Sequence, residues 1–385
     1  MSNGIIDRKE VISVLSDLVR IPSVHPRMGG GKGEAEIARY LADRLRGLGL
    51  APTVIEVQPG RPNVLTTLPA KAGGPHLLFE AHTDTVPPST GHVDPFVPRV
   101  EGDRLYGRGS CDTKASVAAA FTALASILPV RERRASITVA FTMGEELGHD
   151  GAKFLAASGF RADGAVIGEP TGLDVVAAHK GAARWKMVTV GKSAHSSSPE
   201  KGCNAIVKMA TVIRALEERL IPALRKRTHP LVGSPTLSVG RIDGGLQVNV
   251  VPDRCTIELD RRLLPGETWD TVRGELEAVL APIRAADPEL ELVIEEPFQS
   301  LGSMEVALGA PIVRLAREAV RRIDGEHPVR GVAYGTDAAE LSATGIPCVV
   351  LGPGDIAQAH TCTEYVEVQQ VVKAAAMYRE MMLSA

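Results

Sequence analysis

The pattern of apolar and polar positions predicts alternating helices and strands over the first half of the chain. Apolar residues recur at helical spacing just after Asp7 and Glu10, a pair with the spacing of a capping box. Further helices are predicted over residues 34–48, 113–128 and 151–157, and strands over 53–57, 63–68, 76–81, 136–142 and 164–167. Residues 76–81 are apolar nearly throughout, as in a strand buried on both faces. The alternation predicts an α/β domain with a mostly parallel sheet.

Near Gly181 the pattern changes to that of a compact α+β unit. Residues 184–190 alternate in polarity, helices are predicted over 204–220 and 268–286, and strands over 236–241, 247–251, 254–261 and 291–295. The first pattern returns with a helix over 311–323, a strand over 348–351 and a helix from Val368. We therefore expect a discontinuous catalytic domain, residues 1–180 and 297–385, with a ferredoxin-like lid or dimerisation domain inserted at 181–296.

Composition excludes several classes of function. Apolar residues make up 44% of the chain and charged residues 23%, which is typical of a soluble globular protein. The net charge of −3, with both signs interspersed, gives no field that attracts nucleic acid, so no nucleic-acid partner is expected. The N-terminus lacks the apolar core of a signal peptide, and no apolar run approaches the roughly 20 residues that cross a bilayer. Five scattered cysteines favour the reducing cytoplasm.

Histidines and carboxylates stand at the carboxyl ends of the predicted strands or in the loops between elements. In open α/β sheets, ligands bind at that edge. Two histidines with several carboxylates and no thiolate suit a pair of divalent ions, with Zn²⁺ preferred and Co²⁺ or Mn²⁺ as alternatives. The candidates are His82, Asp84, Asp112, Glu145, Glu146, Glu169 and His360.

Two ions roughly 3.5–4 Å apart need a shared ligand, and Asp112 is the natural candidate. One histidine and one more carboxylate then complete each position. The pairs His82 with Glu169 and His360 with Glu146 satisfy this requirement.

The two remaining carboxylates suit supporting roles. Glu145, next to a ligand, is placed to take a proton from the attacking water. Asp84, two residues from His82, can orient that imidazole ring. Six other histidines have no partner pattern and are interpreted as surface or structurally satisfied residues: His25, His76, His92, His149, His229 and His327.

Four motifs resemble one family of metallopeptidases, that of acetylornithine deacetylase, succinyl-diaminopimelate desuccinylase, aminoacylase and glutamate carboxypeptidase. They are His82-Thr-Asp84-Thr-Val-Pro87, Tyr106-Gly-Arg-Gly-Ser-Cys-Asp112-Thr-Lys114, Glu145-Glu146 and Gly168-Glu169-Pro170-Thr171. The resemblance implies the ion ligands assigned above, with Glu145 as general acid and base. It also implies that glutamate at position 169 goes with deacylases and carboxypeptidases. Ala115 departs from the family's usual glycine.

The inserted segment carries further resemblances. Gly191-Lys-Ser-Ala-His195 and Gly202-Cys-Asn204-Ala205 resemble the family's dimerisation motif, which implies a homodimer in which His195 reaches the partner's active site and stabilises the oxyanion. Asn249, in the segment Val-Asn-Val-Val-Pro252, also matches the sequence pattern of this family. Arg262 is implied as the anchor of the substrate's α-carboxylate, with a structural ion pair as the open alternative.

Motifs of the first domain bear on the substrate. Gly335-Thr336-Asp337 resembles a family substrate-pocket loop, and an ordinary helix N-cap is an equal alternative. Ile167-Gly-Glu-Pro-Thr171, Ala178-His-Lys-Gly181 and Gly352-Pro-Gly-Asp-Ile-Ala-Gln-Ala-His360 resemble the acetylornithine deacetylase branch most closely.

This branch implies a small N-acyl amino acid as substrate, with N-acetylornithine of arginine biosynthesis favoured. Succinyl-diaminopimelate desuccinylation and a broad aminoacylase or carboxypeptidase activity remain alternatives. A metal-binding or peptide-binding protein without catalysis is a more remote hypothesis, since no ligand or base is missing.

Overall fold

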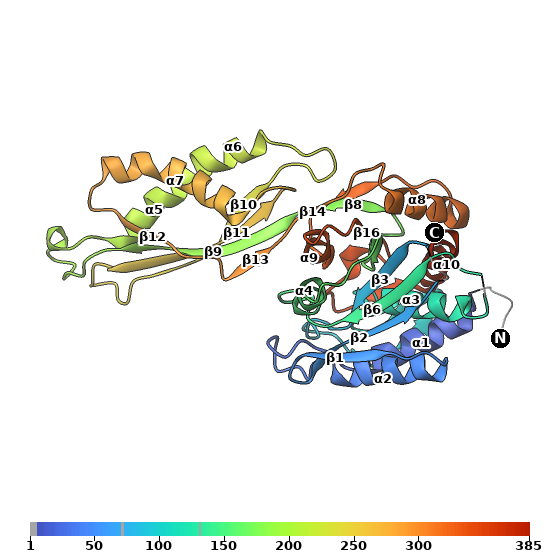
Figure 1. The fold of residues 1–385 in the computed structure, drawn as a ribbon. Helices are drawn as coiled ribbons and strands as arrows, with labels where there is room; N and C mark the ends of the chain where they lie inside the picture. The colour runs from blue at the N-terminus through green and yellow to red at the C-terminus, as the bar shows by residue number, and fades with distance from the viewer. Residues whose placement is uncertain (1–5, 71–72, 131) are drawn as a thin grey trace. The chain divides into compact units, whose positions relative to one another are not determined.

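The computed structural model describes residues 6–70, 73–130 and 132–385 (Figure 1). The chain divides into two compact units. The first comprises the chain up to Ala177, Met304–Gly331 and Thr336–Ala385, and the second comprises Ala178–Ser303 and Val332–Gly335. The second unit extends beyond residue 296 because strand β13 (Gln299–Leu301) pairs with its strand β9 (Gly181–Val190).

The first unit is built on a sheet of mixed direction. Its strands, two of which run across the boundary between the units, are β1 (Thr53–Gln58), β2 (Arg61–Leu68), β3 (His76–His82), β6 (Ser136–Thr142), β7 (Gly164–Ile167), β8 (Val176–His179), β14 (Met304–Glu305), β15 (Arg330–Val332) and β16 (Cys348–Val350). A small second sheet contains β4 (Arg99–Glu101), β5 (Arg104–Tyr106) and β17 (Tyr365–Glu367). The helices are α1 (Arg8–Arg20), α2 (Ala35–Gly47), α3 (Lys114–Ile127), α4 (Asp150–Ala157), α8 (Pro311–Asp324), α9 (Ala338–Ser342), the 3₁₀ turn η3 (Ile356–Gln358) and α10 (Val368–Ser384).

The strand order of the main sheet is β1-β2-β6-β3-β7-β16-β8-β14. Its four central strands, β6, β3, β7 and β16, are parallel, whereas β1, β2 and β8 pair antiparallel with their neighbours. Parallel neighbours end at the same edge, so the loops after these four strands lie together. The α/β fold class is confirmed.

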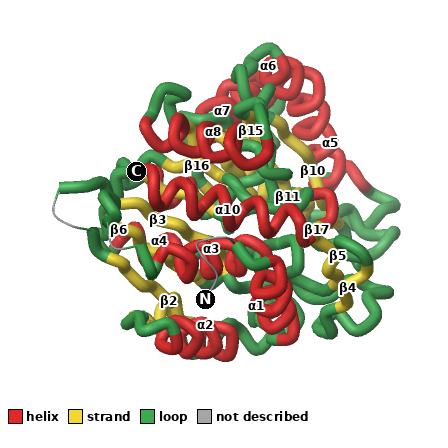
Figure 2. The backbone as a smooth tube through the Cα atoms, turned by 90° about the vertical axis from the view of Figure 1, so that its right-hand side faces the viewer, coloured by secondary structure: helices red, strands yellow, loops and turns green. Residues whose placement is uncertain are grey.

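Helices α3 and α10 lie side by side over the central strands (Figure 2). All but two of the residues of α3 are buried, since α1, α10 and β3 all pack against it. Strand β3 is equally enclosed, with only His76 part-exposed, which matches its nearly continuous apolar sequence. The rigid, buried centre of the sheet therefore carries the loops that follow its strands.

The second unit has the element order β9, α5 (Ala205–Ala215), β10 (Thr236–Gly244), β11 (Arg254–Leu263), α7 (Trp269–Ala286) and β12 (Glu291–Ile294). Its shorter elements are η1 (Pro199–Lys201), η2 (Leu216–Leu220) and α6 (Ile221–Arg225). The strands form an antiparallel sheet in the order β10-β11-β9-β12. A βαββαβ sequence in this arrangement is the ferredoxin-like fold that the sequence predicts.

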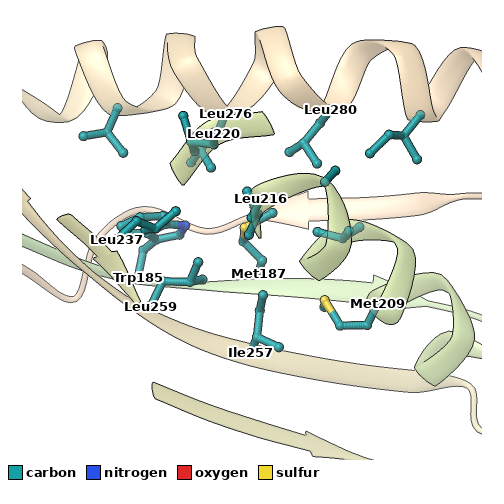
Figure 3. Packing of buried hydrophobic residues seen from close by; sticks show 14 of the residues in the cluster. Trp185, Met187, Met209, Leu216, Leu220, Leu237, Ile257, Leu259, Leu276 and Leu280 are labelled. Carbon is teal, nitrogen blue, oxygen red and sulfur yellow. The ribbon is translucent and has the colours of Figure 1, made fainter. Parts of the chain in front are cut away.

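One apolar core holds the second unit together (Figure 3). Trp185 and Met187 alternate along β9 and meet Ile257 and Leu259 of β11 on the same face. The helices close this layer, with Leu276 and Leu280 of α7 among the residues that face the sheet. Burial of large apolar side chains supplies the main stabilising free energy of such a unit.

Two local predictions in the second unit are wrong. Residues 247–251 form turns and a single bridge from Val250 to His195, because the flexible pair Gly244-Gly245 ends β10 and Pro252 lacks a donor for a further ladder. The helix predicted to end at Leu220 continues to Arg225, through the π-helical turn η2 that precedes Pro222. Among the described residues, no helix has both the length and the apolar character needed to cross a membrane.

Candidate metal centre

The predicted ligands of the first unit lie at one edge of its sheet. His82 is the last residue of β3, Glu169 follows β7, and Glu145 and Glu146 follow β6. Asp112 precedes α3, and His360 lies in the loop between η3 and β17. The fold thus brings Asp112 and His360, which are 248 positions apart in the sequence, into contact.

Asp112 stands between the two histidines. Its Oδ1 lies 3.1 Å from His82 Nε2, and its Oδ2 lies 3.3 Å from His360 Nε2. One carboxylate oxygen therefore faces each imidazole ring. This is the arrangement that a carboxylate shared by two ions requires.

A further carboxylate completes each side. Glu169 Oε1 lies 3.6 Å from His82 Nε2, and Glu146 Oε2 lies 3.1 Å from His360 Nε2. Glu145 Oε2 lies 3.9 Å from His82 Nε2. The ligand atoms of His82, Glu145 and Glu169, and those of Asp112, Glu146 and His360, form two groups within 4.8 Å.

Asp84 is fully buried and supports both parts of this cluster. Its side chain accepts hydrogen bonds from the backbone N–H groups of Glu145 (3.0 Å) and Glu146 (3.2 Å). Its backbone carbonyl oxygen lies 3.1 Å from His82 Nδ1, and its Oδ1 lies 3.4 Å from the same atom. One residue thus fixes the direction of the His82 ring and the turn that carries Glu145 and Glu146.

The crowding of carboxylates shifts their pKa values and those of the histidines. Burial raises the pKa of Glu146 to about 7 and raises the pKa of Glu145 and Glu169 well above the usual range. Hydrogen bonds to Asp112 and Glu146 raise the pKa of His360 to about 10. Burial lowers the pKa of His82, but Glu169 and Asp112 outweigh it and raise that pKa.

These residues fit a pair of divalent cations. The donors are imidazole nitrogens and carboxylate oxygens, the set that zinc and similar ions accept. Several anionic groups are held together in the protein interior, where unpaired charge is costly. Bound cations would compensate that charge, so the chemistry of the donors agrees with a metal centre.

Sequence reasoning missed a buried ion pair beneath the centre, between Arg108 and Glu364. Glu364 also accepts hydrogen bonds from the backbone N–H groups of Gly109, Cys111 and Asp112, at 2.9 to 3.1 Å. Arg108 Nη2 donates to the carbonyl oxygen of Thr361, next to His360. The pair therefore joins the loop of Asp112 to the loop of His360. The position of Arg108 four residues before Asp112 was the available signal.

His149 is not a surface residue, so of the two interpretations given for it only that of a buried, structurally satisfied residue agrees with the structure. Its relative exposure is 2%, and its ring lies among the carboxylates of Glu145, Asp337 and Glu340. The residue was overlooked because it lies outside the motifs, although it follows Glu145 by four positions.

The predicted residues of the second unit lie on its surface. His195 and Asn249 are exposed and come together because Ser196 N–H donates to the carbonyl oxygen of Asn249 (3.1 Å). His195 Nδ1 lies 2.8 Å from Ser197 Oγ. Arg262 is part-exposed, and its Nε donates to Asp260 (3.0 Å).

The loop at Gly335-Thr336 has a local structural role. Thr336 is buried, and its Oγ1 accepts a hydrogen bond from Ala338 N–H (3.2 Å) at the start of α9. This contact favours the helix-cap interpretation for Thr336. Gly335 is part-exposed.

Known proteins resemble the chain over most of its length. The model of peptidase family M20/M25/M40 matches residues 78–384. The acetylornithine deacetylase of Edwardsiella ictaluri is 34% identical over 373 residues, which cover 94% of this chain and 94% of that protein. The acetylornithine deacetylase of Myxococcus xanthus is 33% identical over 309 residues, which cover 80% and 79%.

Solved structures share the fold. Aminopeptidase PepT from Bacillus cereus has a TM-score of 0.80 at 25% identity and covers 98% of both chains. The YXEP protein of Bacillus subtilis, a dinuclear metal binding peptidase, has a TM-score of 0.75 at 17% identity, with 98% of both chains covered. Together with the family match, these relatives show that the chain belongs to peptidase family M20/M25/M40, a family of metal-dependent hydrolases.

Proposed function

We propose that this protein is a dinuclear zinc amidohydrolase that removes the acetyl group from N-acetylornithine. The observation that carries the dinuclear centre is Asp112, which turns one oxygen toward His82 and the other toward His360. Glu169 completes the first position and Glu146 the second. Cobalt or manganese would accept the same ligands.

When bound, such a pair of ions polarises the amide carbonyl and acidifies the attacking water. Glu145 is the general base in this proposal, since it is adjacent to a ligand but not needed as one. It accepts the proton of the water and then donates it to the amine that leaves. Asp84 acts through others, by orienting the His82 ring and the turn that carries Glu145.

The substrate class is supported by relatives named acetylornithine deacetylase at 33–34% identity over most of the chain. An N-acyl amino acid carries an α-carboxylate, which the fork of Arg262 suits. The Nε of Arg262 donates a hydrogen bond to Asp260. This contact orients the guanidinium group and leaves its two terminal nitrogens for a substrate carboxylate in this proposal. Asn249 and Gly335 are the other proposed substrate contacts, and the buried Thr336 supports Gly335 through its cap on α9. The reaction belongs to arginine biosynthesis in the cytoplasm.

A homodimer formed through the second unit is part of the proposal. Strand β10 is an edge strand, and large apolar side chains are exposed on and near it, among them Ile242 (58%), Leu246 (87%) and Val248 (102%). An exposed apolar edge of this kind is a favourable site for pairing with a second copy. Leu246, Val248 and Ser196 line one hollow of about 560 Å³, so His195 adjoins this surface. His195 would serve as the oxyanion donor in the partner's site.

The test is hydrolysis of four substrates with and without a chelator: N-acetylornithine, N-succinyl-diaminopimelate, N-acetylmethionine and a dipeptide with a C-terminal glutamate. We expect chelator-sensitive turnover that is highest for N-acetylornithine. Faster turnover of another member would transfer the proposal to the desuccinylase, or to a broad aminoacylase or carboxypeptidase. Absence of metal-dependent turnover on all four would contradict the proposed function.

Glu145→Gln tests the base. It keeps the size of the side chain and removes its basicity, so we expect metal content to be unchanged and kcat to fall by about 10²- to 10⁴-fold. Retention of near-normal kcat would show that another group takes the proton.

A further inference from the structure

His149 occupies a buried position with an uncommon backbone conformation. It lies directly before α4 with φ of 59°, in the left-handed region that residues other than glycine adopt rarely. Only four such residues occur in the described part of the chain, and His360, the proposed ligand, is another. A conformation of this kind is strained and persists where surrounding contacts require it.

The ring of His149 lies between carboxylates on both sides. Nε2 is 3.5 Å from Glu145 Oε1, and Nδ1 is 3.7 Å from Asp337 Oδ1 and 3.4 Å from Glu340 Oε1. Whichever nitrogen carries the proton, it faces a carboxyl oxygen. Lys153 Nζ also lies 3.9 Å from Glu340 Oε1.

The carboxylate of Glu145 therefore has two differently directed oxygens. Oε2 lies toward His82 and the proposed ions, at 3.9 Å from His82 Nε2. Oε1 lies toward His149. A contact on Oε1 limits rotation of the carboxylate and keeps Oε2 directed at the reacting water.

The other side of the ring is anchored to the sheet. Asp337 is fully buried, and its Oδ2 lies 3.3 Å from the hydroxyl of Thr142, the last residue of β6, a hydroxyl that Asp337 shares with Glu80 as the closer acceptor. Asp337 Oδ1 and His149 Nδ1 face each other, and both are buried with no hydrogen-bond partner among the described residues. Because buried polar atoms are rarely left without a partner, this arrangement indicates that His149 Nδ1 and Asp337 Oδ1 interact with each other.

We propose that His149 is a positioning residue for the general base. Its ring lies between Glu145 and Asp337 and keeps the Glu145 carboxylate directed at the metal centre. This inference rests on the proposed role of Glu145. It adds a residue that lies outside the motifs of the family resemblance, with Asp337 as its support. His149 acts through Glu145 and does not contact the substrate in this proposal.

The test is His149→Asn in the metal-loaded full chain. Asparagine tolerates the left-handed conformation, so the backbone is preserved, but its side chain is too short to reach Glu145. We expect kcat to fall by about 10- to 100-fold, with KM within about twofold and two equivalents of metal retained, because misplacement of a catalytic group costs this much. His327→Asn, at a histidine paired with Asp174 (2.8 Å) away from the centre, is the matched control and should leave kcat unchanged.

A double-mutant cycle separates positioning from a general structural effect. Glu145→Asp withdraws the carboxylate from His149, so His149→Asn should lower kcat by less than about twofold in that background. Equal losses in both backgrounds would overturn the proposal. A third equivalent of metal in the wild type that is lost in His149→Asn would also overturn it, since Glu145, His149 and Asp337 would then be ligands.

A readout independent of turnover distinguishes this inference from the proposed function. Crystal structures of the metal-loaded wild type and His149→Asn should show Glu145 ordered in one rotamer in the former and displaced or split in the latter. An unchanged Glu145 side chain would contradict the positioning role. If the wild type hydrolyses none of the four substrates, the proposed function fails and the rotamer comparison alone decides the role of His149.

Discussion

The two proposed ion positions share Asp112 but differ in the elements that support them. The first position uses His82 and Glu169. His82 is the last residue of β3 and its side chain is 1% exposed, and Glu169 lies just after β7. The second uses His360, whose side chain is 53% exposed and which lies in a loop with φ of 63°. Strands buried at the centre of a sheet are more rigid than surface loops.

This difference concerns how each position is held in place. His82 is oriented by Asp84, which also fixes the turn of Glu146. His360 is held indirectly, since Ser89 Oγ donates to its carbonyl oxygen and the Arg108–Glu364 pair joins its loop to that of Asp112. We therefore expect the first position to bind its ion more tightly than the second.

The largest effect is expected where the two positions meet. Asp112→Asn keeps the shape of the side chain and removes the charge that both ions share. We expect kcat to fall by about a thousandfold, because the ions contribute several kcal/mol of transition-state stabilisation at about 1.4 kcal/mol per factor of ten. Steady-state kinetics and metal analysis of the dialysed protein measure this. Two equivalents of metal with near-normal kcat would exclude Asp112 as the shared ligand.

The comparison itself is tested by removing one histidine at a time. Loss of a ligand should lower the affinity for the ion at that position by more than 10- to 100-fold, which is the usual loss when a residue that only supports a ligand is removed. We expect His360→Ala to retain one tightly bound equivalent and His82→Ala to retain none under the same dialysis. Isothermal titration of the metal-free variants gives the two affinities. The reverse order would show that exposure does not govern affinity here.

Glu364→Gln should weaken the loop-borne second position more than the first, since Glu364 supports the His360 loop as well as the loop of the shared Asp112. The Glu364 carboxylate accepts hydrogen bonds from four donors, namely Arg108 Nη1 and the N–H groups of Gly109, Cys111 and Asp112. In the variant, the NH₂ group of the glutamine would face some of these donors and could not accept their hydrogen bonds. The variant also leaves the Arg108 charge unpaired, which lowers Tm. We expect a 10- to 100-fold loss of affinity at the second position, measured by titration below the lowered Tm. An equal loss of affinity at both positions would show that Glu364 acts through the shared Asp112 and not through the His360 loop.

The pH dependence of metal uptake tests the second position without any substitution. In the metal-free protein Glu146 has a pKa of about 7 and His360 of about 10, so both carry protons at pH 6 that the ion must displace. Affinity should therefore rise with pH, by about tenfold per pH unit for each proton released. Titration in buffers of different ionisation enthalpy counts these protons. Affinity that is constant between pH 6 and 8 would show that the ligands are already free of protons.

Much of the fold was predictable because local patterns agree with the tertiary structure. The apolar run of β3 predicts a buried strand, and parallel neighbours then bring His82, Glu146 and Glu169 to one edge. The βαββαβ order of the second unit also follows from local periodicity. Residues 247–251 were misassigned because alternation alone does not distinguish a strand from an exposed turn between glycines and a proline.

The supporting residues were not predictable in the same way. Glu364 is 255 positions from Gly109, its hydrogen-bond partner, and Asp337 is 188 positions from His149. No pattern within one segment reports such pairs, because each partner is an ordinary polar residue in its own neighbourhood. Their burial arises only when the sheet brings the loops together.

The sequence by itself determined the kinds of element, the identity of the residues suited to metal binding, and the family. These depend on periodicity and on motifs within a few residues, which local chemistry fixes. The tertiary structure alone decided that Asp112 lies between two histidines, that one position is rigid and the other loop-borne, and that His149 lies against Glu145. Distances between side chains depend on how strands pair and loops pack, and these interactions join segments that are remote in the sequence.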